Sequence, residues 1–285
     1  MNAPLDRRLN AFRHDLADAR LRGQIEAANF TEAVTAHIVD PVCDLRSRPD
    51  ENAGIDTQLL ANEQVGVFDH DDQWAWVQAQ SDGYVGYVPR SAITFGPPKP
   101  PTHTVIAPRT FAYPKPDLKA PRIRGLSIGT RVAVVANQEH RGTAYAQLAD
   151  GTWLVSHHLS TLSQHQTDYV SVAETLMETP YLWGGNSAFG IDCSGLVQLS
   201  MRMCGKSVLR DSDMQFQSVG DVVNSGDELI RGDLIFWKGH VAIVRDAETL
   251  IHANGHTMTV AVEKISDAIE RIRYLYAEPI GYRRP

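Results

Sequence analysis

One stretch of the sequence, Thr179 to Gly205, runs from a turn-rich loop directly into a helical pattern. Glycine, proline, asparagine and serine crowd the first half, and such residues mark turns rather than regular elements. Asp192 is a good helix N-cap, and apolar residues then recur at helical spacing up to a glycine suited to a C-cap. The stretch therefore predicts a loop that ends at Cys193, in the first turn of a helix.

Cys193 is the residue in this stretch that carries chemistry. Free backbone N–H groups and the helix dipole favour an anion in a first turn. That environment lowers a thiol pKa towards the thiolate, which is the nucleophilic form. A small buried cysteine that happens to begin a helix explains the residue equally well. A base and an orienting group are needed to decide between the two interpretations.

Two histidines downstream are suited to that task. The segment from Gly232 to Asp246 predicts two strands, and LIHAN, beginning at Leu250, predicts a returning strand. If the turn centres near Asp246, His240 and His252 face each other across neighbouring strands, with Cβ atoms about 4.5–5.5 Å apart. Two imidazoles in this relation hydrogen-bond, so one holds the tautomer of the other.

The motifs PYLWGGNSAFGIDCSGLVQ, RDSDMQ, GDLIFW, GHVAIV and LIHANG, in this order, resemble those of the NlpC family of bacterial cysteine peptidases. The resemblance covers roughly Gln166 to Pro285. It implies a papain-like core that cuts γ-D-glutamyl bonds in murein peptides and needs no cofactor. Carried over by position, Cys193 is the nucleophile, His240 the base and His252 the orienting residue.

The resemblance also implies roles for other residues of this domain. Tyr181 places a phenol near the thiolate or the developing oxyanion, and the backbone N–H of Cys193 is the other expected oxyanion donor. Trp183 walls the cleft or fills the core, and the two roles are compatible. Ser194 and Asp211 match positions that bind the amino terminus or the first residue of the substrate. In an alternative interpretation, Asp211 or its neighbouring serine caps a helix.

Composition restricts the class of protein. A chain of 285 residues suggests two or three domains, and the net charge of −7 argues against nucleic acid or an anionic surface as partner. No apolar run approaches the ~20 residues of a membrane span, and the first residues lack the apolar segment of a signal peptide. Three cysteines far apart in sequence do not form a disulfide framework. Together these features predict a cytoplasmic protein.

The residues before the catalytic segment predict small β domains. Residues 6–28 are polar and rich in helix formers, and from Phe30 onwards short β runs alternate with turn signals. A second, weaker copy follows a proline-rich linker at a constant offset of 67 residues, which pairs Leu59 with Leu126 and Val65 with Val132. Both copies resemble bacterial SH3-like domains.

The predicted fold class is α+β, with a papain-like peptidase domain behind two small barrels. The predicted divisions are an N-terminal helical arm (1–30), a first SH3-like barrel (31–96), a linker with a second SH3-like barrel (97–161) and the catalytic domain (162–285).

The resemblance gives the first barrel a role in binding. In related enzymes with two such barrels, the first abuts the cleft, and a Glu and a Tyr bind the free amino terminus of the substrate. Glu63 and Tyr84 match these positions, and Tyr87 is an alternative to Tyr84. A solvated glutamate at a strand start is the simpler interpretation of Glu63. The histidines His252, His256 and the pair His157-His158 suggest a metal at first sight. No metal site is predicted, because LIHANGHTM predicts a strand and a turn rather than the helix on which zinc-binding histidines four residues apart lie.

The sequence thus predicts a cytoplasmic cysteine endopeptidase of cell-wall peptide recycling. Its expected partner is a free murein tri- or tetrapeptide that contains L-Ala-γ-D-Glu-diaminopimelate, and neither nucleic acid nor a membrane is expected. The alternative is a hydrolase of intact peptidoglycan stems that its barrels anchor, and a third interpretation is a peptide-binding module with a degenerate site. The third substrate residue (diaminopimelate or lysine), the oligomeric state and the role of the second barrel stay open.

Overall fold

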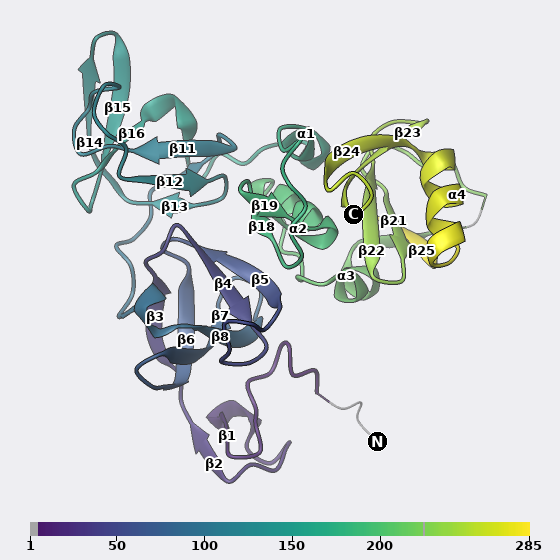
Figure 1. Cartoon of the computed structure of the whole chain (residues 1–285), viewed down its shortest axis with the longest axis horizontal. Helices are drawn as coiled ribbons and strands as arrows, with labels where there is room; N and C mark the ends of the chain where they lie inside the picture. The colour runs from purple at the N-terminus through teal and green to yellow at the C-terminus, as the bar shows by residue number, and fades with distance from the viewer. Residues whose placement is uncertain (1–4, 225) are drawn as a thin grey trace. The chain divides into compact units, whose positions relative to one another are not determined.

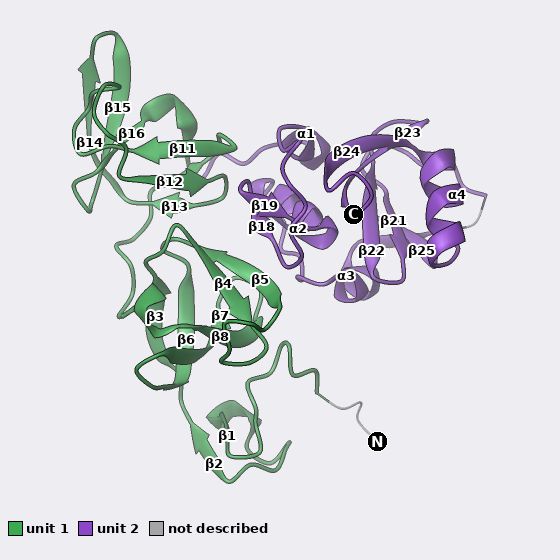
Figure 2. Cartoon of the chain, in the orientation of Figure 1, with its two compact units in different colours: residues 1–162 green, residues 163–285 purple. Residues whose placement is uncertain are grey.

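The computed structural model describes residues 5–224 and 226–285. The chain divides after Leu162 into two compact units, residues 1–162 and residues 163–285 (Figure 2). No helix of the described ranges is long and apolar enough to cross a membrane.

The first unit begins with an irregular arm, not with the predicted helix. The short strands β1 (Leu16–Asp18) and β2 (Asn29–Thr31) pair in parallel, and a 3-10 turn, η1 (Ala19–Leu21), follows β1. The carboxylates of Asp6 and Asp18 accept hydrogen bonds from backbone N–H groups two residues on. Such local bonds compete with helix formation, so the prediction of a helical arm is wrong for these residues. Residues 1–4 of the predicted arm lie outside the described residues.

The arm packs on the sheet that follows it. Ala11 is buried in one cluster with Phe68, Trp76 and Val85. The guanidinium of Arg13 lies 4.5 Å from the centroid of the Trp76 ring. Packing against the neighbouring sheet thus holds the arm in place without helical hydrogen bonds.

A seven-stranded antiparallel sheet follows in the order β5-β4-β8-β7-β6-β3-β9 (Figure 1). Alternate residues of its strands face a shared apolar core, as in β4, whose burial alternates along the strand. The strands are β3 (Val34–Ile38), β4 (Val42–Arg46), β5 (Ile55–Leu60), β6 (Gln64–His70), β7 (Trp74–Ala79), β8 (Val85–Pro89) and β9 (Ile93–Phe95), with the 3-10 turn η2 (Arg90–Ala92) before β9.

The rest of the first unit repeats this order of pairing in smaller sheets. Its elements are β10 (His103–Val105), β11 (Arg109–Ala112), β12 (Arg124–Ser127), β13 (Arg131–Val132), β14 (Val134–His140), β15 (Thr143–Leu148), β16 (Trp153–Val155), η3 (Ser156–His158) and β17 (Leu159–Thr161). The pairs β10–β17, β10–β13, β11–β12, β14–β15 and β15–β16 correspond in order to β3–β9, β3–β6, β4–β5, β6–β7 and β7–β8. That this segment is a second SH3-like barrel stays a prediction.

The second unit is built on a six-stranded antiparallel sheet in the order β20-β25-β21-β22-β23-β24. Its strands are β20 (Asp221–Val223), β21 (Leu234–Trp237), β22 (His240–Val244), β23 (Thr249–Asn254), β24 (Thr259–Lys264) and β25 (Gly281–Arg284). The other elements are α1 (Tyr169–Glu174), the hairpin β18 (Asn186–Ser187) and β19 (Gly190–Ile191), α2 (Cys193–Met203), α3 (Ser212–Ser218) and α4 (Ile265–Leu275).

The sheet of the second unit is covered on both faces, with α2 and α4 on opposite sides (Figure 1). All four residues of β21 are buried, as expected for a strand that is covered twice. Alternate sheet residues such as Ile235 and Val244 pack against Ala268 and Ile272 of α4. Helix α2 contacts β22 and β23, and all but one of its residues are buried. The buried helix α2 therefore lies directly against the strands β22 and β23.

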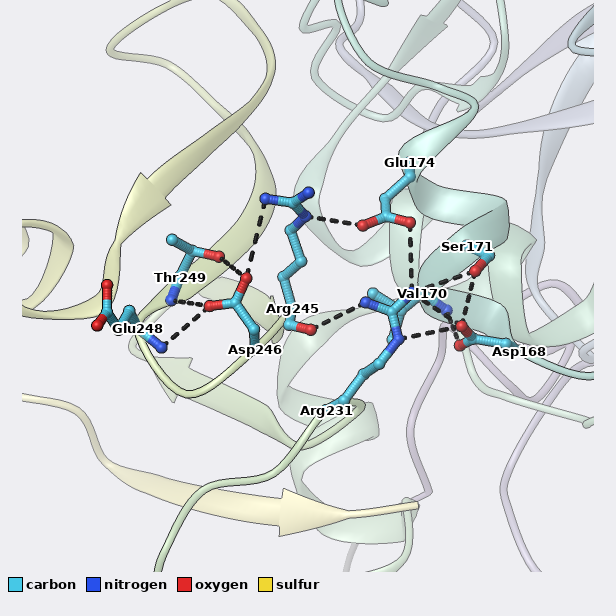
Figure 3. A network of polar contacts seen from close by, with 9 residues as sticks. All are labelled: Asp168, Val170, Ser171, Glu174, Arg231, Arg245, Asp246, Glu248 and Thr249. Atoms are coloured by element: carbon cyan, nitrogen blue, oxygen red, sulfur yellow. Dashed lines mark hydrogen bonds and ion pairs between the residues drawn. The ribbon is translucent and has the colours of Figure 1, made fainter.

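A polar network joins α1 to the loops around β21 and β22 (Figure 3). Arg231 binds Asp168 at 2.8 Å and Glu174 at 3.3 Å, and Arg245 binds Glu174 at 2.7 Å. The next residue, Asp246, accepts backbone N–H bonds that close the turn between β22 and β23. The network holds this turn next to α1.

Candidate active site

The carboxylate of Asp192 organises the start of α2. One oxygen accepts the backbone N–H of Gly195 at 2.7 Å, and the other accepts that of Gly184 at 2.9 Å. The predicted N-cap is thereby confirmed. The predicted end of the helix is confirmed as well, because Gly205 follows the C-cap with a left-handed φ of 74°. The side chain of one residue thus joins the turn-rich loop to the helix.

A buried arginine, Arg210, neutralises this carboxylate. Its side chain is 1% exposed and forms paired contacts with Asp192, at 3.0 Å to Oδ1 and 2.8 Å to Oδ2. It also donates to Oγ of Ser194 at 2.8 Å and to the carbonyl of Gly185 at 3.2 Å. A buried ion pair of this kind is tolerated when further hydrogen bonds satisfy both groups. Sequence reasoning missed Arg210, and the only signal was its place beside Asp211 in RDSDMQ.

The loop before Cys193 packs closely on itself. A Cβ atom at Gly185 would lie 2.6 Å from the carbonyl oxygen of Gly190, so only glycine fits there. Trp183, in the same loop, is 68% exposed. The interpretation that Trp183 fills the core is therefore wrong, and its ring is available as a wall of the site.

Cys193 is the first residue of α2 and is buried. Its thiol accepts a hydrogen bond from the backbone N–H of Val241, the residue after His240. Burial, together with the Asp192 carboxylate, raises the pKa of the Cys193 thiol to about 12 against the opposing effects of the Val241 N–H and Arg210. The prediction of a lowered thiol pKa is wrong, because burial outweighs the helix N-terminus. The resting nucleophile is a neutral thiol that needs a base.

His240 and His252 form the predicted hydrogen-bonded pair. Nε2 of His240 lies 3.0 Å from Nδ1 of His252, and the ring centroids are 5.1 Å apart. The pairing of Ile243 with Ile251 and of Val244 with Leu250 makes the two histidines diagonal rather than directly opposite. The turn lies one residue later than predicted, and the contact survives because the two imidazoles span the diagonal.

Burial keeps both imidazoles neutral. It lowers the pKa of His240 well below the usual range, with further lowering by the charges of His252 and Arg271. It also lowers the pKa of His252, although Glu263 opposes the effect. A neutral imidazole is suited to accept the proton of a neutral thiol during attack rather than before it.

Two residues behind the histidine pair were not predicted. The carboxylate of Glu263, on β24, lies 3.2 Å from Nε2 of His252 and off the axis of an ideal N–H bond. Arg271, on α4, binds the same carboxylate at 2.6 Å. Burial alone would raise the pKa of Glu263, but the contacts with His252 and Arg271 lower it to about 2. A charged residue among the apolar residues of TVAVEK was the only signal in the sequence.

Two family models match the chain. Residues 45–93 match the bacterial dipeptidyl-peptidase SH3 domain, and residues 178–277 match the NlpC/P60 family. Together with the cysteine and the histidine pair inside the second match, this decides the identity of the catalytic unit. Residues 178–277 are an NlpC/P60 domain. The chain is a cysteine peptidase.

Similar proteins cover most of the chain. Dipeptidyl-peptidase 6 of Lysinibacillus sphaericus is 26% identical over 241 residues, which are 78% of this chain and 88% of that protein. The γ-D-glutamyl-L-lysine dipeptidyl-peptidase of Bacillus cereus is 26% identical over 227 residues, 70% of this chain and 67% of that protein. A crystal structure of an NlpC/P60 family protein from Bacillus cereus matches with a TM-score of 0.74 at 22% identity, over 88% of this chain and 99% of the other. The papain-like fold and an SH3-like domain are therefore confirmed.

The other predicted residues of the NlpC/P60 domain are Tyr181, Ser194 and Asp211. The charges of Cys193 and Asp192 contribute to the raised pKa of the Tyr181 phenol, after burial, so this hydroxyl is close to the thiol. Ser194 is buried, and its hydroxyl bonds Asp192 and accepts from Arg210. Asp211 occupies the N-cap position of α3, but its side chain makes no capping hydrogen bond. The interpretation that Ser212 caps this helix is wrong.

The predicted residues of the first barrel lie in the first unit. Glu63 precedes β6, and its Oε2 is buried. Tyr84 is buried and lines a cavity of about 270 Å³ together with Tyr87, whose hydroxyl accepts from Arg13 at 3.2 Å. The choice between Tyr84 and Tyr87, and the role of Glu63 in binding, stay predictions.

Proposed function

We propose that this peptidase hydrolyses the γ-D-glutamyl bond to the third residue of free murein peptides that begin with an unblocked L-Ala, and so releases a dipeptide. The observation that carries the proposal is the contact of the Cys193 thiol with the strand of His240, inside an NlpC/P60 domain. The names of the two relatives, a dipeptidyl-peptidase and a γ-D-glutamyl-L-lysine dipeptidyl-peptidase, support the same bond and the same product length.

In the first half of the proposed reaction, the thiol proton of Cys193 moves to His240 as sulfur attacks the γ-carbonyl carbon of D-Glu. The backbone N–H of Cys193 and the Tyr181 hydroxyl stabilise the resulting oxyanion. The C–N bond then breaks, and the imidazolium of His240 gives its proton to the leaving amine of the third residue.

In the second half, water cleaves the thioester that links the dipeptide to Cys193. His240 takes one proton from the water, the oxygen bonds to the acyl carbon, and sulfur leaves as the thiol after it recovers the proton. His252 holds His240 in place in both halves.

Recognition of the substrate amino terminus is the finer part of the proposal. The carboxylates of Glu63 and Asp211, with the hydroxyl of Tyr84, are the groups assigned to the ammonium of L-Ala. A charge-assisted hydrogen bond is about twice as strong as a neutral one. A stem joined to glycan through its first residue offers no ammonium, so these residues favour free peptides. This preference supports a role in peptide recycling in the cytoplasm.

The second SH3-like segment enters the proposal as a duplicate of the first barrel. The matched order of strand pairs supports duplication. The segment has an apolar core around Val105, Leu126 and Leu154, and Ala61 of the first barrel packs into the same cluster. We assign no contact with substrate to it.

Product masses test the proposal directly. The full chain is incubated with L-Ala-γ-D-Glu-L-Lys, with its diaminopimelate counterpart and with intact sacculi. The expected products are L-Ala-D-Glu and the free diamino acid from one or both peptides, with no release from sacculi. Cleavage of sacculi at a rate similar to that of free peptides would favour the wall hydrolase. No cleavage of any substrate would refute the assigned bond.

A further inference from the structure

A polar chain, partly exposed at its far end, continues beyond the two histidines to elements that the sequence did not connect with the site. Glu263 is on β24, and its carboxylate binds both His252 and, by two contacts of 3.0 and 2.6 Å, Arg271 of α4. The chain of contacts therefore runs from Arg271 through Glu263 and His252 to His240.

The acid–base chemistry of these groups gives the chain a direction. An ionised carboxylate only accepts hydrogen bonds, so Nε2 of His252 must carry the proton that faces Glu263. In a neutral ring the other nitrogen, Nδ1, is then an acceptor. Nε2 of His240, 3.0 Å away, therefore donates to it, and Nδ1 of His240 keeps the lone pair.

We propose that Glu263, held by Arg271, is a positioning residue that fixes the tautomers of both histidines, so that Nδ1 of His240 is the atom that takes the proton of Cys193. The proton moves from sulfur to Nδ1 and later to the leaving amine, while Glu263 gains and loses none. The inference rests on the proposed roles of Cys193 and His240 but not on the identity of the substrate.

The charge of Glu263 also sets the strength of the base. The charged and titratable groups around the pair are Glu263 on β24, Arg271 on α4 and His256 after β23. The thiol of Cys193, on α2, contacts the backbone N–H of Val241, the residue after His240. Burial, the neighbouring imidazole and Arg271 lower the pKa of His240, whereas Glu263 raises it. Without the carboxylate, His240 becomes a weaker base and loses the constraint on its tautomer.

The test uses short pulses of alkylation of Cys193 by iodoacetamide, read as mass-labelled peptide from the full chain, between about pH 2.5 and pH 9, a range that includes the lowered pKa of His240 of about 3. Glu263→Gln keeps the shape but removes the charge, and we expect alkylation about ten-fold slower, by analogy with other groups that orient a histidine. We also expect the acidic limb of the profile to move to lower pH. The matched control is Glu174→Gln. It removes the charge of another ion-paired carboxylate, which binds Arg231 and Arg245 and neither histidine. It should match the wild type in rate and in profile.

Two outcomes would overturn the proposal. One is a Glu263→Gln protein with the wild-type rate and acidic limb, and the other is an equal slowing of both variants with no shift of the limb. A measurement on the unaltered chain covers the case in which Glu263→Gln does not fold. Nitrogen-15 NMR of labelled histidines should find the proton of His252 on Nε2, and a proton on Nδ1 would refute the assignment. Because no substrate enters either experiment, failure of the proposed peptide cleavage is seen separately.

Discussion

Replacement of Arg210 by methionine tests how the nucleophile is held in place. The arginine is buried, and its loss leaves the Asp192 carboxylate without a counter-charge inside the protein. Breaking a buried ion pair on one side costs about 3–5 kcal/mol. In the variant, Asp192 still accepts hydrogen bonds from the backbone N–H groups of Gly184 and Gly195. We therefore expect a loss of unfolding free energy at the lower end of this range, about 3 kcal/mol.

Urea unfolding of the full chain measures this loss in the second unit when it is monitored by hydrogen exchange of peptides from α2. With a urea dependence of about 2 kcal/mol per molar, the midpoint should fall by about 1.5 M. Arg231→Met is the control, because it breaks pairs with Asp168 and Glu174 that are 31–40% exposed. Exposed pairs of this kind contribute about 0–1 kcal/mol.

A double variant separates an orphaned charge from lost packing. Asp192→Asn keeps a good N-cap residue, so combining it with Arg210→Met should restore at least about 1 kcal/mol of the loss. The reasoning is refuted if Arg210→Met lowers the midpoint no more than Arg231→Met, or if the double variant is less stable than Arg210→Met alone.

Three further predictions concern the catalytic residues. Cys193→Ala should abolish peptide cleavage and lower the free energy of unfolding by only about 1 kcal/mol, the centre of the range for point mutants; residual activity above about a tenth would place the nucleophile elsewhere. In steady-state kinetics, His240→Ala should remove turnover almost completely and His252→Ala should remove less, because His252 orients the base without transferring the proton; full activity of His252→Ala would contradict its role. Stability should fall as the pH drops below about 6.5, because the pKa of each of the two histidines is lowered on folding and the unfolded chain then binds more protons. The slope is at most about 1.4 kcal/mol per pH unit for each histidine. Glu263 adds to the loss between its ordinary pKa of 4.5 and about 2. Thermal midpoints measured from pH 7 to pH 4 check this, and a midpoint that stays constant or rises would contradict it.

The parts of the site that the sequence predicted depend on local patterns. A capping aspartate, helical spacing and a terminal glycine are all read within one segment, and so the bounds of α2 agree with the prediction. The histidine pair could be predicted from the sequence because alternation along strands places residues two apart on the same face. A turn placed one residue early kept both imidazoles within reach of each other.

The parts that the sequence did not predict depend on contacts between distant segments. Arg210 pairs with Asp192 across 18 residues, and Arg271 reaches Glu263 from a different element. The pKa of the Cys193 thiol follows burial by the whole sheet rather than its place in the first turn. The N-terminal arm was misassigned for the same reason, since its structure depends on packing against Trp76.

The central claim is that a cysteine peptidase reads an unblocked amino terminus and cuts two residues in. The most direct measurement compares kcat/KM for L-Ala-γ-D-Glu-L-Lys with that for its N-acetylated form, in the wild type and in Glu63→Ala. Loss of a charged hydrogen bond, about 1.5–3 kcal/mol, predicts a fall of roughly ten- to hundred-fold on acetylation, at about 1.4 kcal/mol per decade. Glu63→Ala should lose activity on the free peptide and little on the acetylated one. Similar rates for free and acetylated peptides in the wild type would contradict the account.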